Sequence, residues 1–506
     1  MKRPDMLETL GAGASLLILV LGPVYALQAQ HLFARHIWVD EYFTFMLVSD
    51  PSLSHSLRAL AGGVDTNPPT FHLLLRGFAA PFGGLDEATL RVFAVAAIWL
   101  GLLGVYLLLR RVFSLWPSLV GALAVGSHDL VILHAFEGRF YGTWFAAGAW
   151  FSLLLVSSRD EGARFPRKLL LALSSVLLCT IHYLGIISMG LILLADWLAD
   201  ARPLKARLRA RIPVLLGPVA LVLCIPILLS QRAAYTIPTW IPPLELESGM
   251  LHLRVLSDPL MWSLGLIALV GAAWELLRRF LGWERPRPRG SERQSIRDLA
   301  GMTALVAMPA ALTVFSIVLQ PAYLARYGIT ALLAVAVAAA WIISRTPAWI
   351  AAVICVALVG LGVRAFIRFE EQERFEHEYF ESLAGDIREL TDGEIVVFEI
   401  IHDLYPICHL ERTCRDRFFA YEFSGPPGTP RANLLTVCRD AARNVQAQYG
   451  FPRVVRMAGL HELRRFYFVG AGLNPQIRRI RDMFPGFEVR RVKGKLMEIY
   501  RLDGGP

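Results

Sequence analysis

Long apolar runs separated by short polar segments dominate the first 363 residues of the chain. About 20 apolar residues cross the hydrocarbon core of a bilayer as a helix. A run at 169–198 is too long for one span and has basic residues at both ends, so we expect a hairpin of two helices turning near His182 and Tyr183. With that hairpin, the pattern predicts eleven spanning helices, the others lying near residues 11–30, 91–109, 116–134, 141–157, 213–230, 259–277, 301–319, 327–344 and 348–363.

Lysine and arginine are distributed unevenly between the two alternating sets of connecting segments. The set that contains the N-terminus carries 21 of them, and the other set carries 8 although it is longer. Positive charge marks the cytoplasmic side of a membrane protein. We therefore expect an integral protein of a bacterial inner or plasma membrane, with a cytoplasmic N-terminus and with the chain from about Arg364 onward outside the cytoplasm.

The composition supports this class and excludes others. Hydrophobic residues make up 55% of the 506 positions and charged residues only 18%, against about 25% charged in soluble proteins. An ordinary soluble enzyme and a disordered chain are both excluded. The net charge of +9 follows from the topology and does not indicate a nucleic-acid partner. Six cysteines are too few for a disulfide scaffold.

The organisation that we expect has two parts. The first is a polytopic α-helical membrane domain over 1–366, whose outer loop 31–90 is too aromatic to be disordered. We expect short interfacial helices in this loop, one of them beginning at the turn Asn67-Pro68-Pro69. The second is an extracytoplasmic α/β domain over 367–506, because helical and strand patterns alternate there.

Specific elements are expected within this tail. The predicted helices are 370–390, 431–448 and 475–484. The predicted strands are 394–401 and 465–469, followed by a terminal hairpin turning near 493–495. The glycines of 468–475 are interpreted as a turn before a helix. Cys408 and Cys414 are the most plausible disulfide if the tail lies in an oxidising compartment, but no spacing rule fixes that pairing.

The pair Asp40 and Glu41 follows the first apolar run directly, among aromatic residues. Acidic side chains at a bilayer boundary are costly in free energy unless they are solvated, paired with a cation or part of a functional site. A partly desolvated carboxylate here could take a proton from an acceptor hydroxyl. The alternative is a hydrated acid pair beside an aromatic belt.

Polar residues also gather at other predicted outer boundaries. Arg139 and Arg326 each stand beside a phenol, where an arginine either anchors the helix at the lipid headgroups or binds a phosphate. Asp65 and His72 flank the proline turn, whose role could be purely conformational. The residues at these boundaries are Asp65, Asn67, His72, Glu137, Arg139, Tyr141, Arg326 and Tyr327.

Together these features resemble a GT-C glycosyltransferase of the family 39 type, a group that includes protein O-mannosyltransferases and bacterial aminoarabinose transferases. The resemblance covers roughly residues 10–345. It is carried by Asp40-Glu41, Asn67-Pro68-Pro69, Arg91, Glu137-x-Arg139-x-Tyr141, His182-Tyr183 and Arg326-Tyr327.

The resemblance implies a sugar donor linked to a polyprenyl phosphate and an acceptor hydroxyl on a glycan, lipid or protein, within a shell of membrane lipids. Asp40 would be the general base of an inverting transfer, with Glu41 supporting the site or binding acceptor. The donor phosphate would be bound by Arg139, Tyr141, Arg326 and Tyr327. Substrate-binding or supporting roles would fall to Asp65, Asn67, His72, Glu137, His182 and Tyr183.

No cofactor is implied, and a divalent metal is possible but not required. His36, Asp40, Glu41, Asp65 and His72 lack a recognisable metal-ligand spacing. A central expectation is that Asp40 faces Arg139 and Arg326 across a shared cleft. The alternative function is a multi-spanning lipid or solute transporter or flippase. Such proteins place charged residues near the midplane and often contain internal repeats, whereas here the charges cluster at the outer boundary and no repeat is found.

Overall fold

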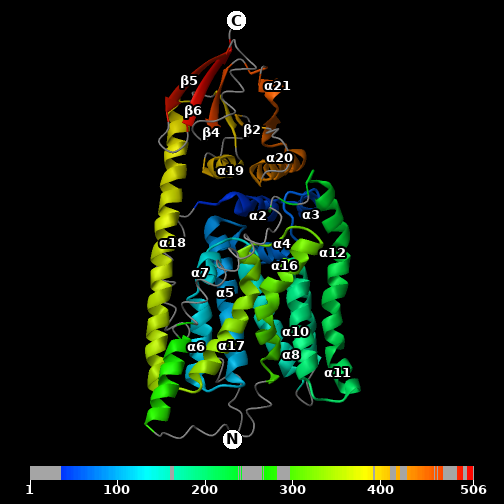
Figure 1. Cartoon of the computed structure of the whole chain (residues 1–506). Helices are drawn as coiled ribbons and strands as arrows, with labels where there is room; N and C mark the ends of the chain where they lie inside the picture. Colours follow the sequence, from blue (N-terminus) through cyan, green and yellow to red (C-terminus); the bar gives the residue numbers. More distant parts are fainter. Residues whose placement is uncertain are drawn as a thin grey trace. The chain divides into compact units, whose positions relative to one another are not determined.

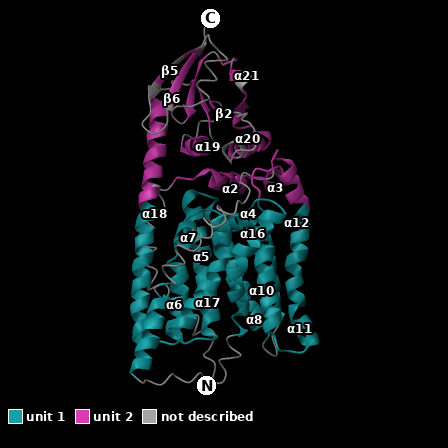
Figure 2. Ribbon diagram, in the orientation of Figure 1, with its two compact units in different colours: residues 1–33, 67–225, 243–370 teal, residues 34–66, 226–242, 371–506 magenta. Residues whose placement is uncertain are grey.

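A computed structural model describes residues 36–159, 165–237, 239, 241, 265, 267–281, 297–390, 394–399, 401–410, 417–421, 430–460, 462–463, 465–470, 487–493 and 498–504. The chain divides into two compact units (Figure 2). Unit 1 comprises 1–33, 67–225 and 243–370, and unit 2 comprises 34–66, 226–242 and 371–506.

Unit 1 is built from helices (Figure 1). Its elements are α4 (Thr70–Ala79), η1 (Ala80–Phe82), α5 (Glu87–Arg110), α6 (Leu115–Gly126), α7 (Asp129–Ala135), α8 (Tyr141–Ser157), α9 (Phe165–Thr180), α10 (Gly185–Ala199), α11 (Leu204–Arg211), η2 (Ile212–Leu215), most of α12 (Leu216–Ala233), α15 (Ala300–Ala304), η3 (Leu305–Ala307), α16 (Met308–Val318), η4 (Ala325–Ala331), α17 (Leu332–Ile343) and the first half of α18 (Ala348–Leu390).

Several of these helices are long and apolar enough to cross a membrane. Among the described residues five qualify, or six if the bent pair α6–α7, with its 66° angle, forms one span. α8 and α10 are shorter apolar helices. A polytopic helical membrane protein is thus confirmed. The predicted span 11–30 and part of 259–277 lie outside the described residues, so the total of eleven stays a prediction.

The predicted hairpin in 169–198 is confirmed, because α9 ends at Thr180 and α10 begins at Gly185. The turn between them is very tight at Gly185. A Cβ atom there would lie 1.8 Å from the carbonyl oxygen of Leu178, which no side chain tolerates. Glycine is therefore required for the two helices to approach at the turn.

The exposure of the apolar helices differs in the way a lipid environment predicts. Only 17% of the most apolar part of 204–233 is buried, against 72% for 325–343. Val219, Val222 and Leu223 on α12 are each more than half exposed. A large exposed apolar face is unusual on a soluble protein, and on α12 it is suited to lipid chains.

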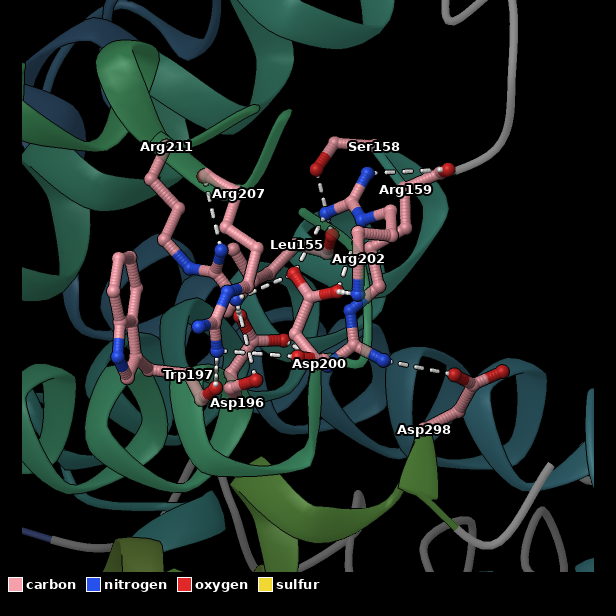
Figure 3. A network of polar contacts seen from close by, with 10 residues as sticks. All are labelled: Leu155, Ser158, Arg159, Asp196, Trp197, Asp200, Arg202, Arg207, Arg211 and Asp298. Atoms are coloured by element: carbon pink, nitrogen blue, oxygen red, sulfur yellow. Dashed lines mark hydrogen bonds and ion pairs between the residues drawn. The ribbon is translucent and has the colours of Figure 1, made fainter. Parts of the chain in front are cut away.

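A network of ion pairs joins α8, α10 and α11 at one end of the helices (Figure 3). Asp196 is only 2% exposed and pairs with both Arg159 and Arg211. Asp200 pairs with Arg202 at 2.9 Å and with Arg211 at 3.0 Å. Burial raises the pKa of Asp200, but its bonds to Arg202 outweigh this and hold the pKa well below its ordinary value. All three arginines belong to the connecting segments of the more basic set.

Replacing Asp196 by Asn should destabilise unit 1 strongly, because it leaves two largely buried guanidinium groups without their shared carboxylate. Breaking a buried pair on one side costs about 3–5 kcal/mol. We expect a clearly lower thermal unfolding midpoint of the detergent-solubilised protein. Asp129→Asn is the matched control, since Asp129 and Arg368 form a pair exposed by 44% and 59%. Equal midpoints for the two variants would contradict a stabilising role for the network.

Unit 2 contains a six-stranded mixed sheet in the order β3-β2-β1-β4-β6-β5. β1 pairs in parallel with β2 and β4, and β3 pairs in parallel with β2, whereas β6 runs antiparallel to both β4 and β5. The strands are β1 (Ile395–Phe398), β2 (Phe418–Tyr421), β3 (Arg453–Val455), β4 (Arg465–Gly470), β5 (Phe487–Lys493) and β6 (Glu498–Gly504). The helices are α19 (Ile401–Leu410), α20 (Pro430–Tyr449), α21 (Met457–Leu460) and the second half of α18.

Most of the elements predicted for the tail are confirmed. The helix expected at 370–390 is the continuation of α18 from the last apolar span, and α20, β4 and the terminal hairpin match their predictions. The strand predicted over 394–401 is wrong at its end, because β1 stops at Phe398 and α19 begins at Ile401. The helix predicted at 475–484 and Cys414 lie outside the described residues.

Two helices of the outer loop also belong to unit 2. α2 (Val39–Ser49) inserts Val39, Phe43 and Leu47 into a buried cluster with Tyr405 and Ala442 of the tail, and α3 (Leu53–Ala61) adds Ala59 and Leu60 to it. Short helices in 31–90, including α4 starting after Pro69, were expected. Their division between two units was not, because no local pattern encodes packing against residues more than 300 positions away.

Gly63 joins the separate segments of unit 2. Its φ of +84° favours glycine. Its carbonyl oxygen accepts hydrogen bonds from the Tyr235 hydroxyl at 2.8 Å and from Asn444 Nδ2 at 3.3 Å. The backbone N–H of Thr236 donates to Asp440 on α20 at 2.7 Å. Three distant stretches of sequence are thereby fixed around one turn.

Asp403 on α19 is a half-buried residue whose carboxylate accepts a hydrogen bond from the Tyr379 hydroxyl of α18 at 2.9 Å. Burial raises the pKa of Asp403 to about 6, with a further contribution from Glu399, against the opposing effect of the Tyr379 bond. Because the folded-state pKa is raised, the stability from this group is complete below about pH 4 and is lost as pH rises through about 6.

Asp403→Asn should therefore raise the unfolding midpoint relative to the parent protein at pH 7.5. The amide oxygen keeps an acceptor for Tyr379, and the substitution removes the partly buried charge. The difference should shrink on acidification and vanish below about pH 4. Thermal unfolding between pH 4 and 8 measures it, with the exposed Glu378→Gln as control. A difference that is independent of pH would contradict the assignment.

Candidate functional site

An aromatic cluster surrounds the start of α8 in unit 1. His182, in the turn between α9 and α10, stacks on Phe140 with ring centroids 4.5 Å apart and on Trp144 at 4.9 Å. The His182 ring also contacts the Tyr327 ring, with centroids 5.0 Å apart. Tyr141 lies 6.4 Å from Tyr327. The cluster brings the starts of α8, α10 and η4 together.

Two arginines lie against this cluster. The Arg326 guanidinium is 5.8 Å from the Tyr141 ring centroid and 5.9 Å from that of Tyr327. The Arg139 guanidinium lies 5.5 Å from the Phe140 ring and is 6% exposed. Arginine stays charged at all physiological pH values and presents donors that match a phosphate. The sequence-predicted residues Arg139, Tyr141, Arg326 and Tyr327 therefore share one environment.

The segment before α8 is held by buried polar contacts. Glu137 and His134 form a close pair, both almost fully buried, and the His134 ring lies 4.2 Å from the Tyr141 ring. Arg91 on α5 is fully buried, and its Nη1 donates to the Phe136 carbonyl at 2.6 Å. Glu137 and Arg91 thus position the loop that presents Arg139 and Tyr141.

The proline turn lies beside the same region. Asn67 and His72 are 4% and 5% exposed. Phe71, next to His72, contacts Phe140 with centroids 6.4 Å apart. The Thr70 hydroxyl donates to that of Thr180, at the end of α9, at 2.8 Å. Asn67 and His72 are therefore near neighbours of the aromatic cluster, as is the half-buried Tyr183 in the turn that holds His182.

The acidic candidates Asp40, Glu41 and Asp65 belong to unit 2. Asp40 and Glu41 occupy the first turn of α2, where the helix dipole favours negative charge. Glu41 is fully buried, and its Oε2 accepts a hydrogen bond from the Trp38 backbone N–H at 3.3 Å. Its visible role is to fix the start of the helix. Asp40, the preceding residue, is half-buried.

Asp40 interacts electrostatically with three residues of unit 2 from distant parts of the sequence. These are Tyr235, His402 on α19 and Cys438 on α20. Burial lowers the pKa of His402 although Asp40 opposes this, and burial raises the pKa of Cys438 to about 12. Cys438 Sγ lies 3.8 Å from His402 Nδ1. The site near Asp40 thus contains a neutral imidazole and a protonated thiol at pH 7.

Asp65 also lies in this environment, since its charge acts on Tyr235 and its Oδ1 accepts from the Thr66 backbone N–H at 2.6 Å. Sequence reasoning missed His402 and Cys438 because neither has a local motif. They approach Asp40 only through the packing of α2 on the tail.

The sequence matches no known family model and no curated protein. The fold, in contrast, matches ArnT from Cupriavidus metallidurans over nearly the whole of both chains. The structure bound to undecaprenyl phosphate has a TM-score of 0.59 and 13% identity, covering 96% of this chain and 98% of ArnT. The apo structure has a TM-score of 0.61 and 12% identity, covering 97% and 98%. The chain therefore has the fold of ArnT, which confirms at the level of the fold the resemblance to the aminoarabinose-transferase type of GT-C protein.

Proposed function

We propose that this protein is a membrane glycosyltransferase that moves a sugar from a polyprenyl-phosphate donor to an acceptor hydroxyl on a glycan, lipid or protein. The observation that carries this proposal is the pair of arginines that lie against the aromatic cluster of unit 1. It gains weight from the fold, which is shared with an ArnT whose structure holds undecaprenyl phosphate.

The phosphate is assigned to Arg139, Arg326, Tyr141 and Tyr327. During transfer the bond between the anomeric carbon and the phosphate oxygen breaks, so negative charge grows on a phosphate monoester. Fixed cations and hydroxyl donors stabilise that charge most effectively in a site that excludes water. The aromatic rings beside both guanidinium groups help to exclude water there without themselves competing for the phosphate.

Asp40 is assigned as the general base. The acceptor hydroxyl transfers its proton to Asp40, and its oxygen attacks the anomeric carbon from the face opposite the phosphate. The polyprenyl phosphate leaves with the bonding electrons, and the configuration inverts. Glu41 supports the base by fixing the first turn of α2. Asp65, Asn67, His72, Glu137, His182 and Tyr183 serve as substrate-binding or supporting residues.

The proposed orientation places the N-terminus in the cytoplasm and unit 2 outside it. The unequal distribution of basic residues supports this orientation. α8 adds a structural argument within unit 1, because Arg139 precedes its start and Arg159, in the basic ion network, follows its end. Its 17 residues separate the two arginines by about 25 Å, close to the thickness of a hydrocarbon core.

Arg326→Ala should weaken binding of undecaprenyl phosphate by about tenfold or more, since a hydrogen bond to a charged group contributes about 1.5–3 kcal/mol. Ligand-induced thermal stabilisation or native mass spectrometry of the purified protein measures this affinity. Arg345→Ala is the matched control, because Arg345 also lies over an aromatic ring, that of Trp341 at 3.3 Å, but follows the other end of α17. An equal loss of affinity in both variants would contradict a role for Arg326 in binding the phosphate.

Asp40→Asn should lower transfer by about 10²–10⁴-fold, the usual contribution of a general base, while donor binding stays near the parent value. The readout is the envelope glycan or glycolipid that disappears from a deletion strain, measured by mass spectrometry after complementation.

Glu41→Gln serves as the neighbouring comparison. Its amide oxygen can still accept the Trp38 N–H, so more activity should survive than in Asp40→Asn. Near-normal product with Asp40→Asn would refute the role of Asp40, and a deeper loss with Glu41→Gln would transfer that role to Glu41.

A further inference from the structure

We propose that His36, His377 and Glu381 form a binding site for a divalent transition metal, of which Zn²⁺ fits best. Within unit 2 one ligand atom of each residue lies within 4.8 Å of the others. Imidazole nitrogen and carboxylate oxygen are established Zn²⁺ ligands, and three protein ligands leave a fourth position for water.

The local structure explains why these three side chains meet. His377 and Glu381 are four residues apart on α18 and so lie on one face of the helix. His36 comes from the segment that leads into α2. Its ring stacks on that of His377 with centroids 4.4 Å apart and planes at 13°, and its edge contacts Phe380.

The distances already approach those of a coordinated ion. His36 Nε2 lies 3.5 Å from Glu381 Oε1. Two ligand atoms of a tetrahedral Zn²⁺, each at about 2.0–2.1 Å, are about 3.3 Å apart. Glu381, at 46% exposure, can change its side-chain torsions. The two stacked rings would have to tilt apart so that a nitrogen of each points at the same ion. The other carboxylate oxygen of Glu381 lies 4.0 Å from Arg388. This contact is weak, and a metal ion bound to Glu381 would replace it.

A second observation concerns His377 alone. Its Nδ1 is buried and has no hydrogen-bond partner among the described residues. A buried polar atom left unsatisfied costs free energy, and imidazole nitrogen is a strong ligand for zinc.

The bound metal would affect the proposed transfer by fixing the position of Asp40, and it would take no part in the reaction itself. His36 lies three residues before α2 and four before Asp40. Coordination would link the segment before α2 to α18 and so restrict the position of the first turn of α2. The ion is not assigned to substrate or to the reacting atoms. Metal binding itself does not depend on the proposed transfer, but its effect on Asp40 does.

The test uses the full-length protein in detergent, with any affinity tag removed and metals stripped with chelator. We expect one equivalent of Zn²⁺ to bind and to raise the unfolding midpoint. His377→Ala and Glu381→Gln should weaken Zn²⁺ binding at least tenfold, measured by competition with a chromophoric chelator. Glu378→Gln, an exposed glutamate on the same helix, should leave the affinity unchanged.

Co²⁺ provides a second readout if a variant folds poorly. Bound Co²⁺ should give the strong visible absorption of a tetrahedral site, and the band should weaken in Glu381→Gln and be lost in His36→Ala. Absence of stoichiometric binding, or equal affinity in all variants, would overturn the proposal. If zinc binds as expected while Asp40→Asn leaves transfer intact, the metal site is supported and the proposed role of Asp40 is refuted.

Discussion

Unit 1 holds two fixed positive charges, Arg139 and Arg326, against aromatic rings near the starts of α8 and η4. A guanidinium group close to an apolar boundary is costly unless an anion or a π-face meets it. Arg326 has two tyrosine rings near it and Arg139 has a phenylalanine ring. The tight turn at Gly185 and the buried bond from Arg91 serve this arrangement, because they hold His182 and the loop before α8 in place.

The acidic candidates are held by a different principle. Asp40 and Glu41 gain from the N-terminal dipole of α2, and the apolar face of that helix is buried against the tail. A segment that adjoins the first apolar run in sequence thus obtains its core from residues near the other end of the chain. This makes the tail part of the environment of the proposed base, with His402 and Cys438 as its neighbours.

Much of this could be predicted from sequence because the relevant signals are local. The lengths of the apolar runs predicted the spans, and the flanking basic residues predicted the hairpin at His182. The prolines after Asn67 predicted the start of α4. The grouping of Arg139, Tyr141, Arg326 and Tyr327 followed from their common position at span ends. His402 and the metal-ligand geometry of His36 with His377 could not be predicted, because each depends on contacts between segments that no periodicity relates. α19 was not predicted, because its ten residues contain Pro406, which disfavours the interior of a helix.

The meeting of three chain segments at the Gly63 carbonyl has a consequence for biosynthesis. Residues 34–66 leave the ribosome early, yet Asn444 and the α19 and α20 side chains that cover them are translated more than 300 residues later. At about 5–20 residues per second, the apolar faces of α2 and α3 wait roughly 20–70 s for their partners. During that interval a lipid surface or a chaperone has to shield them, so the order of translation itself imposes a requirement for temporary protection of this segment.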